Sequence, residues 1–267
     1  DWKKIRAELD KVMERRDDLP NFHDIMDEVR TITSDNMWKT FFLAGYGLES
    51  EENSKRCPDT TEIIKRIPGM KTAFFSILAP KKHIPAHRGP YNGVLRYHLG
   101  LIVPEPKEIC RIRIEDQIAH WEEGKSLIFD DTFEHEVWND TDGFRAILFV
   151  DFVRPVMFPF NLLNEFLINA ASFAPLIKEA EVRHKKWEKD FYKQEVTKYR
   201  PGRGALPGPR HPLFYGAPPA NTLKAGKLNL DKPADVLILI VLRRQLCKRV
   251  KAITRTRSIE LLRELNA

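Results

Sequence analysis

The chain has 267 residues, of which 42% are hydrophobic, 31% are charged and 10% are aromatic. This composition excludes a wholly disordered chain and a collagen-like repeat, and the length suffices for one large domain or a domain with an appendage. Three widely spaced cysteines exclude a disulfide scaffold and a cysteine-rich zinc module. No apolar run reaches the roughly 18 residues that a membrane-spanning helix needs. The sequence begins at Asp1 rather than Met, which leaves an N-terminal anchor as an open alternative.

Charge is unevenly distributed along the chain, whose formal net charge is +6. Residues 194–267 carry 15 Lys and Arg against 5 Asp and Glu, whereas residues 1–193 carry 29 against 33. A basic segment joined to a mildly acidic body often binds polyanions. Nucleic acid is a disfavoured partner, because the segment lacks interleaved aromatic residues, zinc-ligand spacing and a helix-turn-helix pattern.

The first half of the chain changes from helical to strand-like patterning. Residues 1–17 space their apolar side chains as an amphipathic helix does, and residues 18–71 are predicted to form short helices and loops. Short β-type runs separated by polar turns then predict a barrel or a sandwich. The predicted strands cover residues 72–79, 94–103, 109–115, 126–130, 134–138 and 144–153.

The rest of the chain divides into three predicted segments. Residues 156–177 are apolar except for a polar residue every three or four positions, which indicates a helix with a very wide apolar face. That helix either packs on the barrel or in a dimer contact, or lies in a membrane interface. Residues 194–222 are predicted as a Pro/Gly-rich linker and residues 223–267 as a basic helical tail of unknown role. We therefore expect one domain at 1–193, with its β core at about 70–155.

Two predicted strands place arginines among apolar neighbours. Arg96 and His98 share one face of the strand at 94–103, and Arg145 shares a face of the strand at 144–153 with Ile147 and Phe149. Such groups are costly to bury without an anionic partner. Two arginines of this kind can clamp a dicarboxylate, because guanidinium and carboxylate form paired hydrogen bonds. The alternative is a pair of arginines that face solvent on edge strands.

Histidines flank these strands, His87 before them and His135 between them. Neutral imidazole is the commonest protein ligand for iron, copper and zinc, although a lone histidine is more often structural. In a rolled β-sheet, this order of a histidine, an Arg/His strand, a second histidine and a further arginine can bring two metal ligands and an arginine anchor into one lumen.

Several ordered segments also match a known family. They are Ser76-Ile-Leu, His83-Ile-Pro-Ala-His87-Arg-Gly-Pro, Leu95-Arg96-Tyr-His98-Leu-Gly-Leu, Trp121-Glu-Glu-Gly124, Phe129-Asp-Asp-Thr-Phe-Glu-His135-Glu-Val-Trp138 and Phe144-Arg145. Through them residues 38–155, a little under half of the chain, resemble the aspartyl/asparaginyl β-hydroxylase family of Fe(II)- and 2-oxoglutarate-dependent dioxygenases. The resemblance is closest to the bacterial branch that 2-hydroxylates lipid A acyl chains. It implies a mainly β fold with flanking helices and a double-stranded β-helix core of the jelly-roll or cupin-like type.

The resemblance implies an iron centre with two protein ligands, His87 and His135. Most non-haem iron oxygenases add a carboxylate to two histidines. The position for that carboxylate is Gly89 here, and the family typically lacks it, so the third position would be taken by water. Asp131 matches an acidic family position and would orient this water. Its alternative role is that of a turn-forming residue at 130–132.

The resemblance also implies a site for 2-oxoglutarate. Arg145 would pair with its distal carboxylate, and Ser76, Arg96 and His98 would hold its other oxygens. His83 has no ligand role in the family pattern and is expected to line the pocket or to be structural.

The implied activity is hydroxylation of an unactivated C–H bond with O₂ as co-substrate. The expected substrate is an acyl chain of lipid A or a related membrane lipid; a peptidyl aspartyl or asparaginyl side chain is the alternative. A non-catalytic β-barrel binding module is a second alternative. We expect a cytoplasmic protein of a bacterium, associated with an anionic membrane surface through residues 156–177 and the basic tail.

Overall fold

The computed structural model describes residues 1–45, 47–171 and 175–198. The chain divides into a compact unit, Asp1–Asp190, and a second unit, Phe191–Ala267. All strands of the described residues lie in the first unit. The predicted basic tail and most of the predicted linker lie outside the described residues. No helix in the described part of the chain has the length and apolar character needed to cross a membrane.

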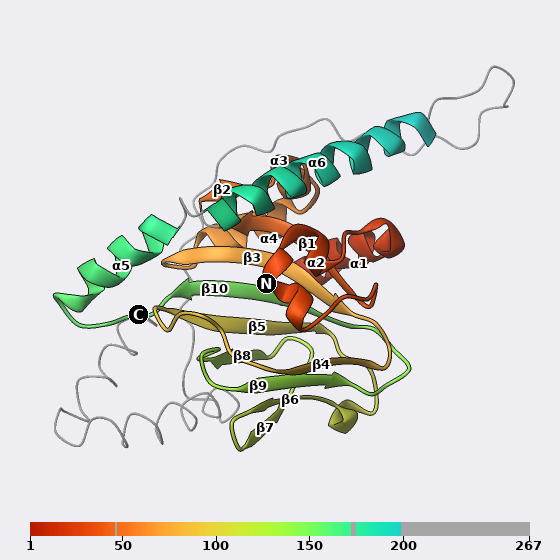
Figure 1. Cartoon of the computed structure of the whole chain (residues 1–267). Helices are drawn as coiled ribbons and strands as arrows, with labels where there is room; N and C mark the ends of the chain where they lie inside the picture. Colours follow the sequence, from red (N-terminus) through yellow and green to blue (C-terminus); the bar gives the residue numbers. More distant parts are fainter. Residues whose placement is uncertain (46, 172–174, 199–267) are drawn as a thin grey trace, which may run out of the picture. The chain divides into compact units, whose positions relative to one another are not determined.

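Eight strands form a double-stranded β-helix (Figure 1). The larger sheet contains the order β3-β10-β5-β8 and the smaller sheet the order β4-β9-β6-β7, with antiparallel pairing throughout. The chain crosses repeatedly between the two sheets, so strands that are far apart in sequence, such as β4 and β9, become neighbours. This arrangement confirms the predicted fold class. The strands are β3 Met70–Leu78, β4 Lys82–His87, β5 Val94–Ile102, β6 Cys110–Ile114, β7 Gln117–His120, β8 Ser126–Phe129, β9 His135–Asn139 and β10 Arg145–Val153.

Two further strands widen the larger sheet. β1 (Trp38–Gly45) pairs with β3, and β2 (Leu48–Glu49) pairs with β1. The prediction of only short helices and loops over 18–71 is therefore wrong in this stretch. Trp38, Phe41 and Leu43 are buried, and this apolar run supplies the burial that an added strand needs.

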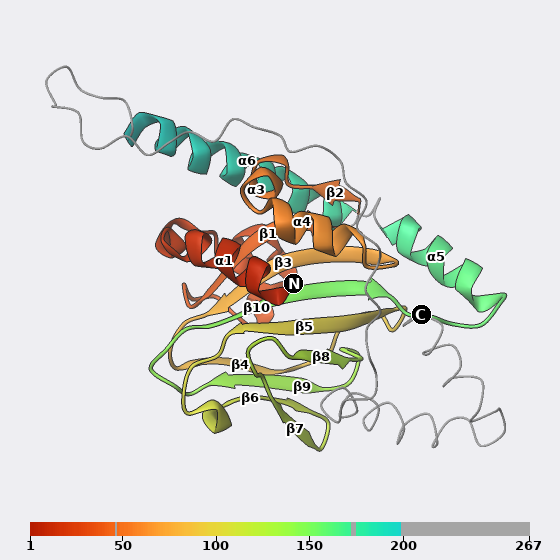
Figure 2. The ribbon, with the colours of Figure 1, turned by 180° about the vertical axis from the view of Figure 1, so that it is seen from behind.

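Helices gather around β1 and β3, as Figures 1 and 2 show from opposite sides. The buried Glu8 accepts hydrogen bonds from the backbone N–H groups of Asp59 and Thr60 and from the Thr60 hydroxyl. Its carboxylate thereby satisfies donors at the start of a neighbouring helix. These helices are α1 Trp2–Met13, α2 Phe22–Ile25, α3 Glu51–Arg56 and α4 Pro58–Lys65, with 3₁₀ turns at Arg16–Asp18 and Asp27–Thr31. A further 3₁₀ turn, Lys107–Ile109, lies against β6.

Two helices follow the β core, where one was predicted over 156–177. α5 spans Phe160–Ala171 and α6 spans Pro175–Lys198. Proline lacks a backbone N–H and is best accommodated at a helix start, so Pro159 and Pro175 favour new helix starts there. α6 also continues five residues into the predicted linker. It is fixed within the first unit by Glu188, whose Oε1 accepts a hydrogen bond from the Ser50 hydroxyl.

The main core fills the space between the two sheets. It combines side chains of the larger sheet, such as Phe74 and Phe149, with side chains of the smaller sheet, such as Ile112 and Val137. Alternate side chains of a strand face this core. His87, His135 and Arg145 lie at strand ends, whereas Ser76, Arg96 and His98 lie within β3 and β5.

Candidate active site

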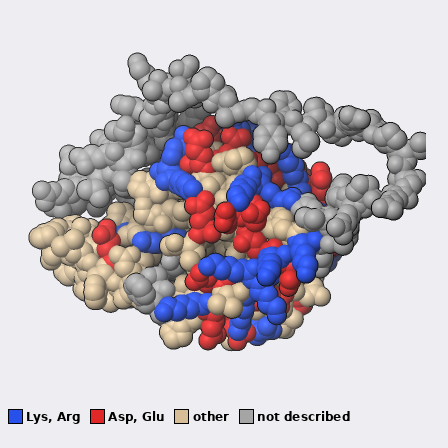
Figure 3. All heavy atoms as spheres, turned by 90° about the horizontal axis from the view of Figure 1, so that it is seen from above, with Lys and Arg blue, Asp and Glu red and all other residues tan. Residues whose placement is uncertain are grey.

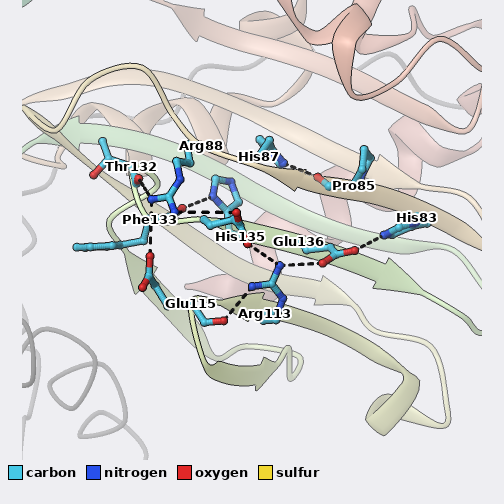
Figure 4. Close-up of polar contacts among 11 residues, drawn as sticks. His83, Pro85, His87, Arg88, Arg113, Glu115, Thr132, Phe133, His135 and Glu136 are labelled. Atoms are coloured by element: carbon cyan, nitrogen blue, oxygen red, sulfur yellow. Dashed lines mark hydrogen bonds and ion pairs between the residues drawn. The ribbon is translucent and has the colours of Figure 1, made fainter.

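The two predicted metal ligands lie side by side. His87 ends β4 and His135 begins β9, and the two residues are direct partners in the antiparallel pairing of these strands. Their ring centroids are 4.1 Å apart, with 53° between the ring planes. Figure 4 shows the two rings near the end of the smaller sheet. The fold thus brings together two histidines that are 48 positions apart in sequence.

Backbone carbonyls fix the tautomer of both rings. His87 Nδ1 lies 2.8 Å from the Pro85 carbonyl oxygen, and His135 Nδ1 lies 2.9 Å from the Phe133 carbonyl oxygen (Figure 4). A carbonyl oxygen only accepts, so each Nδ1 carries the proton and donates it. Each Nε2 then keeps its lone pair, as metal ligation requires.

Burial keeps both rings neutral. Desolvation is the main cause that lowers the pKa of His135 to about 3, and the neighbouring His87 lowers it further. Desolvation likewise lowers the pKa of His87, to which the Arg96 charge contributes. A neutral imidazole binds a cation, whereas a protonated one repels it. The pair is therefore competent to bind a metal at neutral pH.

The Asp131 carboxylate occupies the space where a third ligand would otherwise project. Gly89 donates its N–H to the Asp131 carbonyl oxygen at 2.7 Å. A Cβ on Gly89 would lie 2.1 Å from Asp131 Oδ2, far inside van der Waals contact. Glycine is thus required by close approach at this position. Within the described residues, no cluster of three or more His, Cys, Asp or Glu side chains is placed to bind a metal.

Arg96 holds Asp131 in this position. Its Nη2 lies 2.9 Å from Asp131 Oδ2, and its Nε lies 3.0 Å from Asp151 Oδ1. Burial raises the pKa of Asp131, and the Arg96 charge opposes that shift. Asp131 Oδ1 is buried and has no hydrogen-bond partner among the described residues. One oxygen is therefore anchored, while the other is left to accept a hydrogen bond.

Arg145 is buried and has no carboxylate partner among the residues that the structure describes. It is 2% exposed, and its guanidinium lies 4.7 Å from the centroid of the Trp121 ring. Its Nε has no hydrogen-bond partner among the described residues, and desolvation lowers its pKa to about 10. A buried guanidinium is costly unless an anion pairs with it. This residue therefore marks a site for an anionic ligand.

Further unpaired polar atoms lie in the same interior. Both ring nitrogens of His98 and Nε1 of Trp121 are buried and without hydrogen-bond partners in the described part of the chain. His98 packs against the rings of Phe129 and Phe149. Ser76 Oγ accepts a hydrogen bond from Trp38 Nε1 at 3.0 Å, which leaves its own proton free to be donated.

These orphaned atoms fit the implied cofactors. Two imidazole nitrogens with free lone pairs suit Fe(II), and a buried unpaired guanidinium among polar donors suits a keto-diacid. The sequence analysis assigned no role to Trp121, although it quoted the segment that contains it. It also missed Asp151, whose pairing with Arg96 crosses 55 positions of sequence.

His83 lies away from this interior. Its Nε2 lies 2.7 Å from Glu136 Oε1, and Glu136 also pairs with Arg113 (Figure 4). The His83 ring stacks on Trp138, 5.4 Å between centroids. His83 is therefore part of a polar network on the outer face of the smaller sheet, and it does not line the site as one prediction allowed.

Known proteins match the chain over the same region. The family model described as Aspartyl/Asparaginyl beta-hydroxylase matches residues 1–155, so the likeness begins well before the predicted start at Trp38. An ornithine lipid ester-linked acyl 2-hydroxylase of Rhizobium tropici is 56% identical over 202 residues, which cover 75% of this chain and 72% of that protein. The human aspartyl/asparaginyl beta-hydroxylase is 39% identical over 163 residues, 59% of this chain and 21% of that protein.

Solved structures resemble the chain only remotely. A Cupin_2 domain of a transcriptional regulator from Enterobacter cloacae gives a TM-score of 0.30 at 11% identity, covering 45% of this chain and all of that one. A predicted oxalate decarboxylase from Thermotoga maritima gives 0.29 at 12% identity, covering 46% and 98%. The match to more than half of the chain and the extensive identity to its relatives show that this protein belongs to the aspartyl/asparaginyl beta-hydroxylase family of enzymes.

Proposed function

We propose that this chain is an Fe(II)- and 2-oxoglutarate-dependent dioxygenase that hydroxylates an acyl chain of a membrane lipid. The observation that carries the proposal is the His87–His135 pair together with the buried Arg145, which has no carboxylate partner among the described residues; Arg145 and His135 both act electrostatically on His98, which is buried in the interior. The substrate class is supported by the 56% identity to an ornithine lipid acyl 2-hydroxylase. That relative favours an ornithine lipid over the lipid A named from the sequence.

The described side chains have defined roles in this proposal. Bound Fe(II) and 2-oxoglutarate would supply the activation of O₂, the oxidant, one of whose oxygen atoms would go to succinate as 2-oxoglutarate loses CO₂ and the other into the unactivated C–H bond. His87 and His135 would hold the metal through Nε2. Asp131 would accept a hydrogen bond at Oδ1 from a water in the third position. Arg145 would bind the distal carboxylate of the keto acid through two parallel hydrogen bonds.

Other polar groups would complete the co-substrate site. The Ser76 hydroxyl and Trp121 Nε1 are donors suited to oxygens of the keto acid, and His98 adds a ring N–H. Arg96 is held by Asp131 and Asp151, so we assign it the positioning of Asp131. Direct contact between Arg96 and 2-oxoglutarate stays a prediction.

Mass spectrometry of a reconstituted reaction tests this function. The purified chain, supplied with Fe(II), 2-oxoglutarate, O₂ and ornithine lipid, is expected to add one oxygen to the ester-linked acyl chain and to release succinate. The His135→Ala variant is the matched negative control. Succinate release without lipid oxidation on any acyl lipid would overturn the substrate class, and no iron-dependent succinate release at all would favour the non-catalytic module.

A peptidyl substrate is the second candidate. It is favoured by the 39% identity to the human aspartyl/asparaginyl beta-hydroxylase, of whose length this chain spans about a fifth. The same assay with Asp- and Asn-containing peptides distinguishes the two. A gain of one oxygen on a peptide and none on lipid would assign this chain to the peptidyl reaction.

Membrane association at the cytoplasmic face belongs to the same proposal. A lipid acyl chain has to be reached from a bilayer, so an enzyme acting on it needs a surface that seats there. The predicted contribution of the basic tail concerns residues outside the described part of the chain and stays a prediction.

A further inference from the structure

α5 exposes most of its apolar side chains, whereas an ordinary surface helix buries them. Amphipathic helices bury an apolar stripe and expose polar residues. In α5, the polar Asn164 is among the buried residues, 7% exposed, together with Ile168 at 3%. The exposed apolar side chains of α5 and its N-terminal approach, which we call the docking face, are Met157 64%, Phe158 76%, Phe160 65%, Leu162 56%, Leu163 54%, Phe166 67% and Leu167 43%.

The docking face is wide and almost uncharged. At about 100° per residue, the exposed apolar positions from Phe160 to Leu167 cover an arc of about 160°. Residues 155–177 contain no Lys, Arg or Asp, and Glu165 is their one charged residue. In Figure 3 the end of the molecule where α5 lies is mostly uncharged surface. Contiguous exposed apolar surface of this kind marks an interaction site.

The width of the arc favours a bilayer over a partner helix. A helix that packs in a coiled coil needs only a narrow a/d seam, whereas a helix immersed in the acyl boundary of a membrane uses a broad apolar face. One cation borders the docking face, since Lys71 Nζ lies 3.4 Å from Asn169 Oδ1 at the C-terminal end of α5. A cation at such a border interacts favourably with lipid phosphates. Arg154, which precedes α5, is instead paired with Asp130.

Asn164 joins α5 to the chain that follows a proposed metal ligand. Its Nδ2 donates to the Gly93 carbonyl oxygen at 2.9 Å, and its Oδ1 accepts from the Tyr91 hydroxyl at 2.7 Å. A Cβ on Gly93 would lie 2.0 Å from Asn164 Oδ1, so only glycine allows this contact. The joined segment, residues 88–93, runs directly from His87 to β5.

We propose that the docking face seats this enzyme on a lipid bilayer and that Asn164 links the seated helix to the segment after His87, so that the acyl substrate is taken from the membrane rather than from a soluble carrier. The substrate part rests on the proposed function, whereas docking on the bilayer stands on the surface alone.

Vesicle flotation with the full-length chain tests docking. Phosphatidylcholine vesicles, which have no net charge, minimise attraction to the basic residues beyond 198. The wild type is expected to float with the vesicles, and a Phe160→Ser/Phe166→Ser double variant is expected to lose more than about tenfold in partitioning, since two aromatic side chains stay in water. Val182→Ser is the matched control, because Val182 is equally exposed, 67%, but lies on α6. Its binding should equal that of the wild type.

Three outcomes would overturn docking. In the first, the wild type does not bind vesicles. In the second, the double variant binds vesicles as well as the wild type does. In the third, the wild type is a dimer that does not bind vesicles and the double variant is a monomer, which would make the docking face a dimer interface. Metal and 2-oxoglutarate binding by the double variant should be unchanged, because the substituted side chains face away from the core.

Activity separates failure of docking from failure of the proposed function. The double variant is expected to lose hydroxylation of lipid in vesicles and to retain it on the same lipid in detergent micelles. Equal loss in both would refute delivery from the bilayer. A wild type that binds vesicles but oxidises no lipid would leave docking intact and refute the proposed function. Faster hydroxylation of an acyl thioester on a soluble carrier would overturn the substrate part alone.

Discussion

At the scale of single residues, the site depends on polar atoms that are buried before any ligand binds. Two carbonyl oxygens hold Nδ1–H of His87 and His135 and leave both Nε2 atoms free. Arg145 lies in the same interior without a carboxylate partner in the described part of the chain. Unsatisfied buried groups are rare in folded proteins, and a cluster of them fits a site for a polar ligand.

Removing either histidine is expected to abolish metal binding. His87→Ala or His135→Ala leaves one imidazole, and the affinity for Co(II), an oxygen-stable probe for the iron site, should fall by more than about 100-fold. Isothermal titration calorimetry measures it. His83→Ala is the matched control, since His83 pairs with Glu136 on the outer face and should leave affinity unchanged. A loss with His83→Ala equal to that of the other two would contradict the assignment.

Stability of the metal-free protein should fall in acid because of His135. Its folded-state pKa is lowered to about 3, so between that value and the unfolded value of about 6.5 only the unfolded state binds the proton. The free energy of unfolding in EDTA is therefore expected to decrease from pH 7 to pH 4. Urea titrations should show a smaller decrease for His135→Gln, whose side chain does not titrate. An equal pH dependence in the two proteins would show that His135 is not the cause.

Replacing Arg145 is expected to weaken 2-oxoglutarate binding. Loss of two charge-assisted hydrogen bonds should raise the KM for 2-oxoglutarate by about 100-fold or more in Arg145→Ala, with a much smaller effect on the lipid KM. Arg145→Lys should restore little of the affinity for 2-oxoglutarate, because an ammonium group lacks the planar geometry with which a guanidinium forms two parallel hydrogen bonds. Steady-state succinate release measures both constants. A larger effect on the lipid KM would assign Arg145 to the substrate instead.

At the scale of elements, the ends of β4 and β9 are packed too closely for a third ligand at position 89. Gly89→Asp is expected to push against the Asp131 carboxylate, which Arg96 holds in place, and to lower the free energy of unfolding by about 1–3 kcal/mol. Chemical denaturation measures this, and activity should fall with it. The Asp131→Ala background should relieve the destabilisation. A large gain of activity in Gly89→Asp would contradict the two-histidine site.

Sequence patterning predicted the elements that alternate or repeat regularly. β5 and β10 were found because apolar runs with few interruptions mark buried strands. β1 was missed because its residues were grouped with the loops around it, and β4 because its few residues include Pro85 and exposed positions. The predicted helix over 156–177 proved to be two helices, with prolines near both starts.

Contacts between residues that are distant in sequence could not be predicted from the hydrophobic pattern. The metal ligands were recognised from ordered motifs, but the Arg96–Asp151 pair and the abutment of Asp131 on Gly89 depend on which strands are neighbours. The burial of Asn164 could not be predicted from the sequence either. From sequence alone, a polar residue on an apolar helix is expected to face solvent. In the structure, Asn164 instead forms hydrogen bonds with Gly93 and Tyr91.

At the scale of the whole compact unit, the double-stranded β-helix explains why a small number of strand ends suffices for a site. Its alternating sheets bring the end of β4, the start of β9 and the start of β10 to the interior that the core leaves polar. α5 then presents an apolar face next to the segment that follows His87. Residues 87–93 thus connect the proposed metal ligand His87 to the helix that carries the docking face.

The most direct test of the central claim is an anaerobic titration of the Fe(II)-loaded chain with 2-oxoglutarate, followed by visible charge-transfer absorption. Chelation of the keto acid to the metal is expected to produce the band in the wild type. It should be absent in His135→Ala and require far more 2-oxoglutarate in Arg145→Ala. A band of equal strength and equal half-saturation in all three proteins would show that these imidazoles and this guanidinium do not hold the iron and the keto acid.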